Sequence, residues 1–138
     1  SDPHYHLVNA AIDEEISIYS IPGPSALLAA LTVSSLPMDR IVFEGFLPRK
    51  KGRNTRLENL ANEQRTVVIF ESPNRINKTL QDLYQYFGNR KVAITRELTK
   101  MYEEVIRGNL EEFSTLTRNW KGEITGVIAG ADKKKRKS

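Results

Sequence analysis

The amino-acid sequence predicts an α/β fold in which helices flank a mixed sheet, and three observations support this prediction. Strand-like and helix-like segments alternate along the 138 residues. The run Thr66–Phe70 is typical of a strand buried on both faces. Over residues 74–87, apolar residues recur at the spacing of one helical face: Ile76, Leu80, Leu83, Tyr84 and Phe87.

The elements expected before residue 65 follow from periodicity and from one strong break. In chain order they are a helix over 5–14, a half-buried strand over 16–21, the break Pro22-Gly23-Pro24, a small apolar helix over 25–35, a strand over 41–46 and a polar helix over 55–63.

The second half of the chain continues the alternation. Gly88-Asn89 ends the helix over 74–87, and strands are expected over 91–95, 103–107 and 124–129. A helix is expected between the last two strands. Asn109 is suited to its N-cap, Glu112 to the partner position of a capping box, and Phe113, Leu116 and Trp120 share its apolar face.

The chain divides into three parts on this interpretation. Residues 1–21 supply one helix and one strand with nothing evident to pack on, so we expect them to be a remnant of a preceding N-terminal domain. Residues 22–130 form the α/β domain. Residues 131–138 form a basic tail that we expect to be disordered. The chain is accordingly expected to be a fragment.

Composition narrows the class of protein. There is no cysteine, so disulfides and cysteine-ligated metals are excluded, and no segment has the length of a membrane span or the pattern of a signal peptide. We therefore expect a cytoplasmic protein. Five of the 21 Lys and Arg residues lie in the tail at 133–137. The rest of the chain has 16 cationic and 17 anionic residues, so the positive net charge comes from the tail. A second basic cluster, "RKKGRNTR", lies between predicted elements at 49–56.

Candidate site residues follow the predicted strands, because ligands of open α/β sheets collect at the carboxyl ends of strands. The four candidate strand ends are Pro22 to Ala26, Glu44 to Lys50, Glu71 to Arg75 and Arg96 to Lys100. Each also has a purely structural interpretation, as a helix start, a strand exit or a surface ion pair. Glu103 and Glu104 are expected on the exposed rim.

Several familiar sites are missing from the sequence. It has no G-x-G-x-x-G, phosphate-binding loop, G-x-S-x-G or H-E-x-x-H pattern. His4 and His6 are its only histidines, so we expect no metal site.

A set of longer motifs resembles one known family. They are "SDP", "PGPSALLAAL", "LPMDRIVFEGFLPRKKGRN", "RTVVIFESPNRI", "ITRELTKMYEE" and "GEITGVI". Their order and spacing resemble the C-terminal part of bacterial 16S ribosomal RNA cytidine 2′-O-methyltransferases, which are class III, tetrapyrrole-methylase-like enzymes. The resemblance implies S-adenosylmethionine as cofactor, small-subunit ribosomal RNA as substrate and a homodimer. That family commonly has Gly where His4 stands.

The resemblance also implies roles for individual residues. Cofactor contacts are expected from Pro24, Ser25, Ala26, Phe70, Glu71, Arg96, Gly122 and Glu123. Candidates for a general base are Glu71, Glu97 and Lys100. RNA contacts are expected from Arg49, Lys50, Arg53 and Arg75, where Arg75 could instead pair with Glu71.

Two other functions stay open at this stage. One is a methyltransferase acting on a porphyrin or corrin, against which the basic cluster at 49–56 argues. The other is an RNA-binding or dimerisation module without chemistry of its own. Methylation assays on ribosomal particles and on a tetrapyrrole would distinguish between the two candidate methyltransferase substrates.

Overall fold

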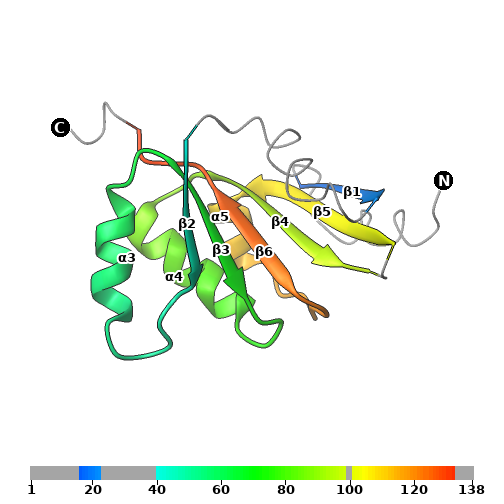
Figure 1. Ribbon diagram of the computed structural model, residues 1–138, viewed down its shortest axis with the longest axis horizontal. Coiled ribbons are helices and arrows are strands. Elements are labelled where there is room, and N and C mark those ends of the chain that lie inside the picture. Colours follow the sequence, from blue (N-terminus) through cyan, green and yellow to red (C-terminus); the bar gives the residue numbers. More distant parts are fainter. Residues whose placement is uncertain (1–15, 23–39, 99–100, 133–138) are drawn as a thin grey trace.

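A computed structural model of the protein describes residues 16–22, 40–98 and 101–132, and it confirms the predicted α/β fold with a mixed sheet (Figure 1). The elements are β1 (Ser17–Pro22), β2 (Ile41–Phe46), α3 (Arg53–Ala61), β3 (Thr66–Glu71), α4 (Ile76–Phe87), β4 (Lys91–Glu97), β5 (Tyr102–Asn109), α5 (Leu110–Thr115) and β6 (Ile124–Ile128).

The six strands form one sheet in the order β1-β5-β4-β6-β3-β2. Strands β2 and β3 are parallel, and every other neighbouring pair is antiparallel. It follows that β1, β2, β3 and β4 all point in one direction, whereas β5 and β6 run in the opposite direction. Of the two edges that run across the strand ends, one therefore carries the carboxyl ends of four strands and the starts of the other two.

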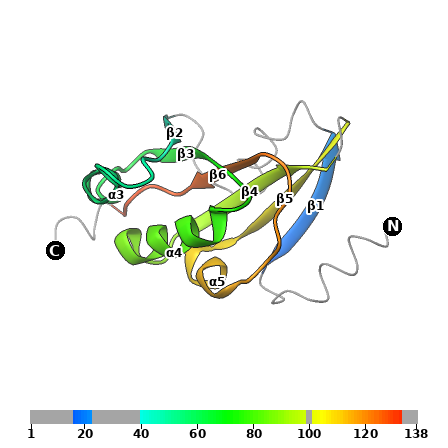
Figure 2. The same cartoon turned by 90° about the horizontal axis from the view of Figure 1, so that it is seen from below.

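The helices cover one face of this sheet, as Figure 2 shows. The larger core packs helical residues such as Leu57, Leu80 and Phe113 against the strand residues that point to this face, among them Ile69 and Ile94. On the opposite face, Val68, Ala93, Val105 and Val127 form a smaller cluster. Residues 67–69 and 92–94 are buried throughout, which explains why these stretches of β3 and β4 are continuously apolar.

The last helix is shorter than predicted. The capping box is confirmed: the Asn109 side chain accepts from the Glu112 amide at 3.0 Å, and the Glu112 carboxylate accepts from the Asn109 amide at 3.1 Å. However, α5 ends at Thr115, because Leu116 is extended at ψ 122. Trp120 is still buried, since the loop after the helix folds back and its indole donates to Asn77 Oδ1 at 2.8 Å.

The first strand differs from the expected domain division. Strand β1 lies at the sheet edge and pairs along its whole length with β5, from Ser17 opposite Arg107 to Pro22 opposite Tyr102. It therefore has a partner in the same sheet, which local sequence could not reveal because the paired residues lie 80 to 90 positions apart. The helices expected over 5–14 and 25–35, and the basic tail after residue 132, lie outside the described residues.

The helices are short. None of those in the described ranges has the length and apolar character needed to cross a membrane.

Candidate functional site

One edge of the sheet gathers segments that lie far apart in the sequence. Strands β3 and β4 end there with Phe70-Glu71 and Arg96-Glu97. Strand β6 lies between these two strands and begins at the same edge, preceded by Gly122-Glu123. The structure thus brings together three of the pairs that the sequence analysis singled out.

A pocket of about 440 Å³ lies at this edge. Its lining residues are Phe46, Phe70, Glu71, Ser72, Pro73, Gly122, Glu123, Ile124 and Thr125. The Oγ atom of Ser72 is buried and has no hydrogen-bond partner among the described residues. An apolar wall with a few polar groups is typical of a site for a small organic molecule.

Glu71 is held firmly in place. Its carboxylate accepts a hydrogen bond from the Thr79 hydroxyl at 2.6 Å and another from the Ser72 amide at 2.8 Å. Arg75 Nε lies 3.9 Å from the same carboxylate, which matches one of the two roles considered for Arg75, and its contact with RNA stays a prediction. Because Glu71 is buried and its oxygens are engaged, its geometry suits positioning better than proton transfer.

Glu104 is the second anchored carboxylate. It is only 1% exposed and its Oε1 accepts from Arg96 Nε at 2.6 Å and from Arg118 at 2.5 Å. The expectation that Glu104 lies on the exposed rim is wrong, because on β5 it points into this pair of guanidinium groups. Burial lowers the pKa of Arg118, and the neighbouring Glu104 carboxylate acts against that shift.

The loop between α5 and β6 is fixed at several points. Arg118 binds Glu104 and stacks on Trp120 at 4.5 Å, and the Asn77 side chain donates to the Arg118 carbonyl at 3.0 Å. Gly122 has φ 82, and a Cβ atom there would lie 2.9 Å from the Glu97 carbonyl oxygen. Only glycine fits this close approach, which holds Gly122-Glu123 against the end of β4.

Three carboxylates lie near one another beside these anchored groups. Glu97 and Glu103 are directly opposite each other on β4 and β5. The pKa of Glu103 is raised, chiefly by burial and further by the charges of Glu97 and Glu123. In the described ranges no group of three or more His, Asp or Glu side chains could hold a metal ion.

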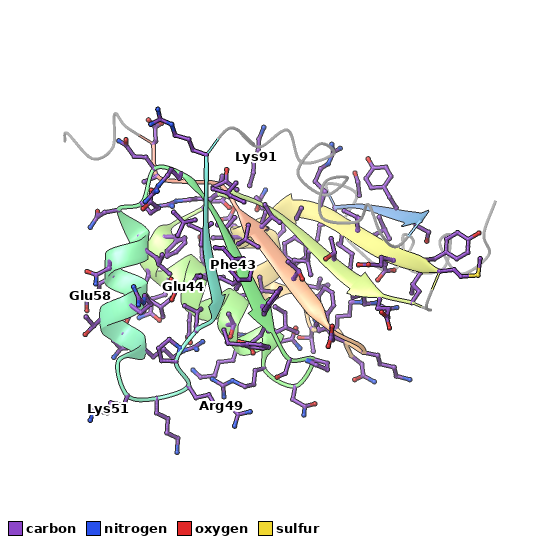
Figure 3. All side chains as sticks on the ribbon, in the orientation of Figure 1. Phe43, Glu44, Arg49, Lys51, Glu58 and Lys91 are labelled. Carbon is purple, nitrogen blue, oxygen red and sulfur yellow. The ribbon has the colours of Figure 1, made fainter. Side chains whose placement is uncertain are left out.

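The loop between β2 and α3 carries exposed cations. Arg49, Lys50 and Lys51 are exposed, and Figure 3 shows Arg49 and Lys51 extending from this loop. Arg49 also lines a second pocket of about 290 Å³, which shares Phe46, Glu71 and Ser72 with the larger one. The basic loop and the strand-end pocket are therefore neighbours.

Arg53 does not belong to this exposed group. It is 5% exposed, and its guanidinium donates to Asp82 at 2.9 Å, to the Thr79 hydroxyl at 3.0 Å and to the Pro48 carbonyl at 2.9 Å. The structure contradicts the expectation that Arg53 contacts RNA phosphates. Helix α3 begins at Arg53, earlier than the predicted Thr55, and this start turns the side chain inward toward α4.

The remaining candidates lie outside the described residues. They are Pro24, Ser25, Ala26 and Lys100. Sequence reasoning also missed Arg118 and the Glu104 pairing, since only contacts between strands and loops reveal them. One signal in the sequence pointed to the burial of Glu104. Alternate residues of a strand lie on the same face, so Glu104 shares its face of β5 with the buried Ile106.

Comparison with known proteins now supplies the family. The family model described as "Tetrapyrrole (Corrin/Porphyrin) Methylases" matches residues 1–114. The chain is 49% identical over 134 residues to "Ribosomal RNA small subunit methyltransferase I" of Mycobacterium tuberculosis, covering 95% of this chain and 47% of that protein. It is 44% identical over 134 residues to the protein of the same name from Thermotoga maritima, covering 96% and 60%.

These matches extend along nearly the whole chain, which spans about half the length of the curated relatives. They agree with the motif resemblance and with the six-stranded mixed sheet. The chain belongs to the tetrapyrrole methylase family.

Proposed function

We propose that the full-length protein is an S-adenosylmethionine-dependent methyltransferase that methylates the 2′-hydroxyl of a cytidine ribose in small-subunit ribosomal RNA. The observation that carries this proposal is the shared sheet edge, where an apolar pocket adjoins a loop of exposed cations. The similarity to proteins named ribosomal RNA small subunit methyltransferase I supports the choice of substrate.

The pocket residues fit the proposed cofactor. A volume of about 440 Å³ is within the range of small-molecule sites, roughly 300–1,000 Å³. Phe70 offers apolar surface for an aromatic base, and the Ser72 hydroxyl, which has no hydrogen-bond partner among the described residues, could bind a polar group. The bound cofactor would supply an electrophilic methyl group on a sulfonium centre.

The residues of this chain would then orient the reactants. Glu71, anchored by Thr79 and Ser72, fixes the pocket wall, while the Glu104 pair fixes the end of β4 through Arg96. Of the candidate bases, Glu97 is exposed at the same edge, so we propose that its carboxylate takes the proton of the ribose hydroxyl. Such a base contributes roughly 10²–10⁴-fold to the rate.

Methyl transfer to RNA tests this assignment. In the full-length protein, Glu97→Gln should lower turnover by roughly 10²-fold or more on small ribosomal subunits, because the hydroxyl loses its proton acceptor. Glu58→Gln is the matched control, since Glu58 is an exposed carboxylate on α3 (Figure 3) and does not line the pocket. Wild-type turnover in the Glu97→Gln variant would show that Glu97 is not the general base. Transfer of the methyl group only to a tetrapyrrole, and not to ribosomal subunits, would overturn the proposed substrate.

RNA binding by the basic loop has its own test. Replacing Arg49 and Lys50 together by Ala should reduce the salt dependence of RNA binding, with the slope falling by roughly 0.7 for each phosphate of a single strand that is no longer neutralised. Arg40→Ala with Lys91→Ala is the control pair, because both residues are exposed at the opposite edge of the sheet, before β2 and at the start of β4. An unchanged slope in the Arg49 and Lys50 variant would exclude the loop from the interface.

The proposal extends to assembly and location. The motif resemblance implies a homodimer, which sedimentation of the full-length protein tests. A ribosomal substrate implies the cytoplasm, which cell fractionation tests.

A further inference from the structure

An irregularity in β2 changes the face on which one aromatic side chain lies. In a regular strand, Phe43 and Phe46 would point to opposite faces, because they are an odd number of residues apart. Here Phe43 lies opposite Val68, Gly45 opposite Ile69, and Phe46 opposite Phe70, so that Glu44 is an extra residue. Gly45 has φ 73, a conformation that favours glycine. The bulge therefore turns Phe46 onto the face of Phe43.

The result is an aromatic cluster of Phe43, Phe46 and Phe70 on the sheet face opposite the helices. The ring of Phe70 lies edge-to-face with both others, with centroids 5.0 Å from Phe43 and 5.5 Å from Phe46. The three side chains are 59%, 67% and 36% exposed, in the order Phe43, Phe46 and Phe70. Neighbouring phenyl rings that stay this exposed indicate a surface for a partner.

The position of the cluster suggests which partner. Phe46 and Phe70 line the strand-end pocket, and Phe46 lines the second pocket together with Arg49. The exposed cations Arg49 and Lys50 lie in the loop between β2 and α3, and neither is in an ion pair with a described residue. The cluster thus borders both the pocket for a small molecule and the exposed positive charge of Arg49.

We propose that Phe43 and Phe46 form a stacking platform for unpaired bases of an RNA strand beside the nucleotide that reacts, with Phe70 supporting both rings. This inference rests on the proposed function. RNA fits both parts of the surface, because its bases stack on aromatic rings and its phosphates attract the adjacent Arg and Lys side chains. An apolar protein partner would match the rings but would leave the cations unmatched.

Proximity to the pocket gives the platform its role. A ribose that reacts at the pocket must have its neighbouring nucleotides close to the pocket, which the exposed Phe46 helps to line. Stacking there would hold the strand open and orient the ribose, in keeping with recognition of single-stranded RNA rather than duplex. A strand continuing past Phe46 would reach Arg49 at the second pocket.

Base fluorescence in the full-length protein tests the platform. The probe is a single-stranded oligoribonucleotide of the target sequence with 2-aminopurine beside the target cytidine. Stacking on wild-type protein should quench the probe. Phe43→Leu and Phe46→Leu should relieve the quenching and weaken binding roughly 5-fold or more each, since stacking on an aromatic ring is worth about 1–3 kcal/mol per base. The salt slope should stay unchanged, because neither substitution removes a charge.

Two further variants separate stacking from apolar contact. Phe43→Trp should keep the quenching, because it retains a flat ring. Ile41→Ala removes an exposed apolar side chain from the same strand and should leave both quenching and affinity unchanged. If the probe is still quenched by both Phe43→Leu and Phe46→Leu proteins, the stacking platform is overturned. If the Arg49 and Lys50 variant still reduces the salt dependence of RNA binding in that case, the proposed function remains intact. A shift of the monomer–dimer equilibrium in Phe43→Leu, with RNA binding unchanged, would overturn it in favour of a protein interface.

Discussion

At the scale of single residues, the site depends on charges that are anchored rather than free. Glu104 lies buried between Arg96 and Arg118, and Arg53 lies buried against Asp82. A buried ion pair adds little over apolar packing, but removal of one partner leaves an uncompensated charge. These residues therefore fix geometry, and their replacement should affect folding before chemistry.

The Glu104 pair gives the first prediction. Glu104→Ala should lower the free energy of unfolding by about 3–5 kcal/mol, because Arg96 and Arg118 would remain buried without their carboxylate. Urea unfolding monitored by Trp120 fluorescence measures the change. Glu58→Ala, on the exposed face of α3, should change it by less than about 0.5 kcal/mol. Equal effects of the two variants would contradict the structural role of Glu104.

Glu103 gives a prediction about pH. Its pKa is raised in the folded protein above the ordinary value of 4.5, so the unfolded chain loses this proton first as the pH rises. Folding stability should therefore fall from about pH 4.5 until the folded-state pKa is passed. Glu103→Gln should lack this fall and be more stable at pH 7 by about 0.2–1 kcal/mol, since it also relieves the opposed Glu97 charge. Parallel stability–pH curves for the two proteins would exclude the effect.

At the scale of elements, the loop between α5 and β6 shows how an irregular segment becomes a rigid wall. It is held by the Arg118–Glu104 pair, by the Trp120–Asn77 hydrogen bond and by the contact of Gly122 with the end of β4. Each contact joins the loop to a different regular element. The position of Gly122-Glu123 in the pocket is therefore set by β4, β5 and α4 together.

Gly122 tests this idea with an internal control. Gly122→Ala should destabilise the protein by more than the roughly 1–2 kcal/mol of left-handed strain alone, because the new Cβ would meet the Glu97 carbonyl oxygen at 2.9 Å. Gly52→Ala has left-handed strain at φ 82 and ψ −1 but nothing within 4 Å of the new Cβ. Thermal unfolding of both variants measures the difference. If the two proteins melt together, the close approach of Gly122 to Glu97 is not present in solution.

At the scale of the whole molecule, strand direction determines where the site lies. Strands β1, β2, β3 and β4 point in the same direction, although most neighbouring pairs in the sheet are antiparallel. The segments that follow these four strands therefore share one edge. The pocket at that edge is partly open to solvent. We expect cofactor binding to need more of the protein than these residues.

Calorimetry can test that expectation. Residues 1–138 alone should bind S-adenosylmethionine weakly or not at all, because their pocket is partly open to solvent, whereas the full-length protein should bind it measurably. Circular dichroism of the same sample checks that the shorter chain is folded. Tight binding by the 138-residue chain would show that this edge is a complete cofactor site.

Local sequence patterns predicted much of the fold. The alternation over 16–21, the buried run 66–70 and the apolar face of 74–87 led to strands and a helix in those places. The predicted helix ended too late, at Trp120, because the indole is buried by tertiary contacts and so mimics the periodicity of a helix. The basic cluster was assigned as one exposed group, although Arg53 turns inward once α3 begins there.

The sequence by itself determined the element types, the capping box, the family and the strand ends at which candidate residues gather, because these depend on periodicity and motifs within a few residues. Only the tertiary structure decided that β1 pairs with β5, that Glu104 lies between two arginines, and that the bulge at Gly45 places Phe46 beside Phe43. Those outcomes depend on strand register and on contacts between residues distant in sequence, and a one-residue change in register reverses the face of every side chain that follows.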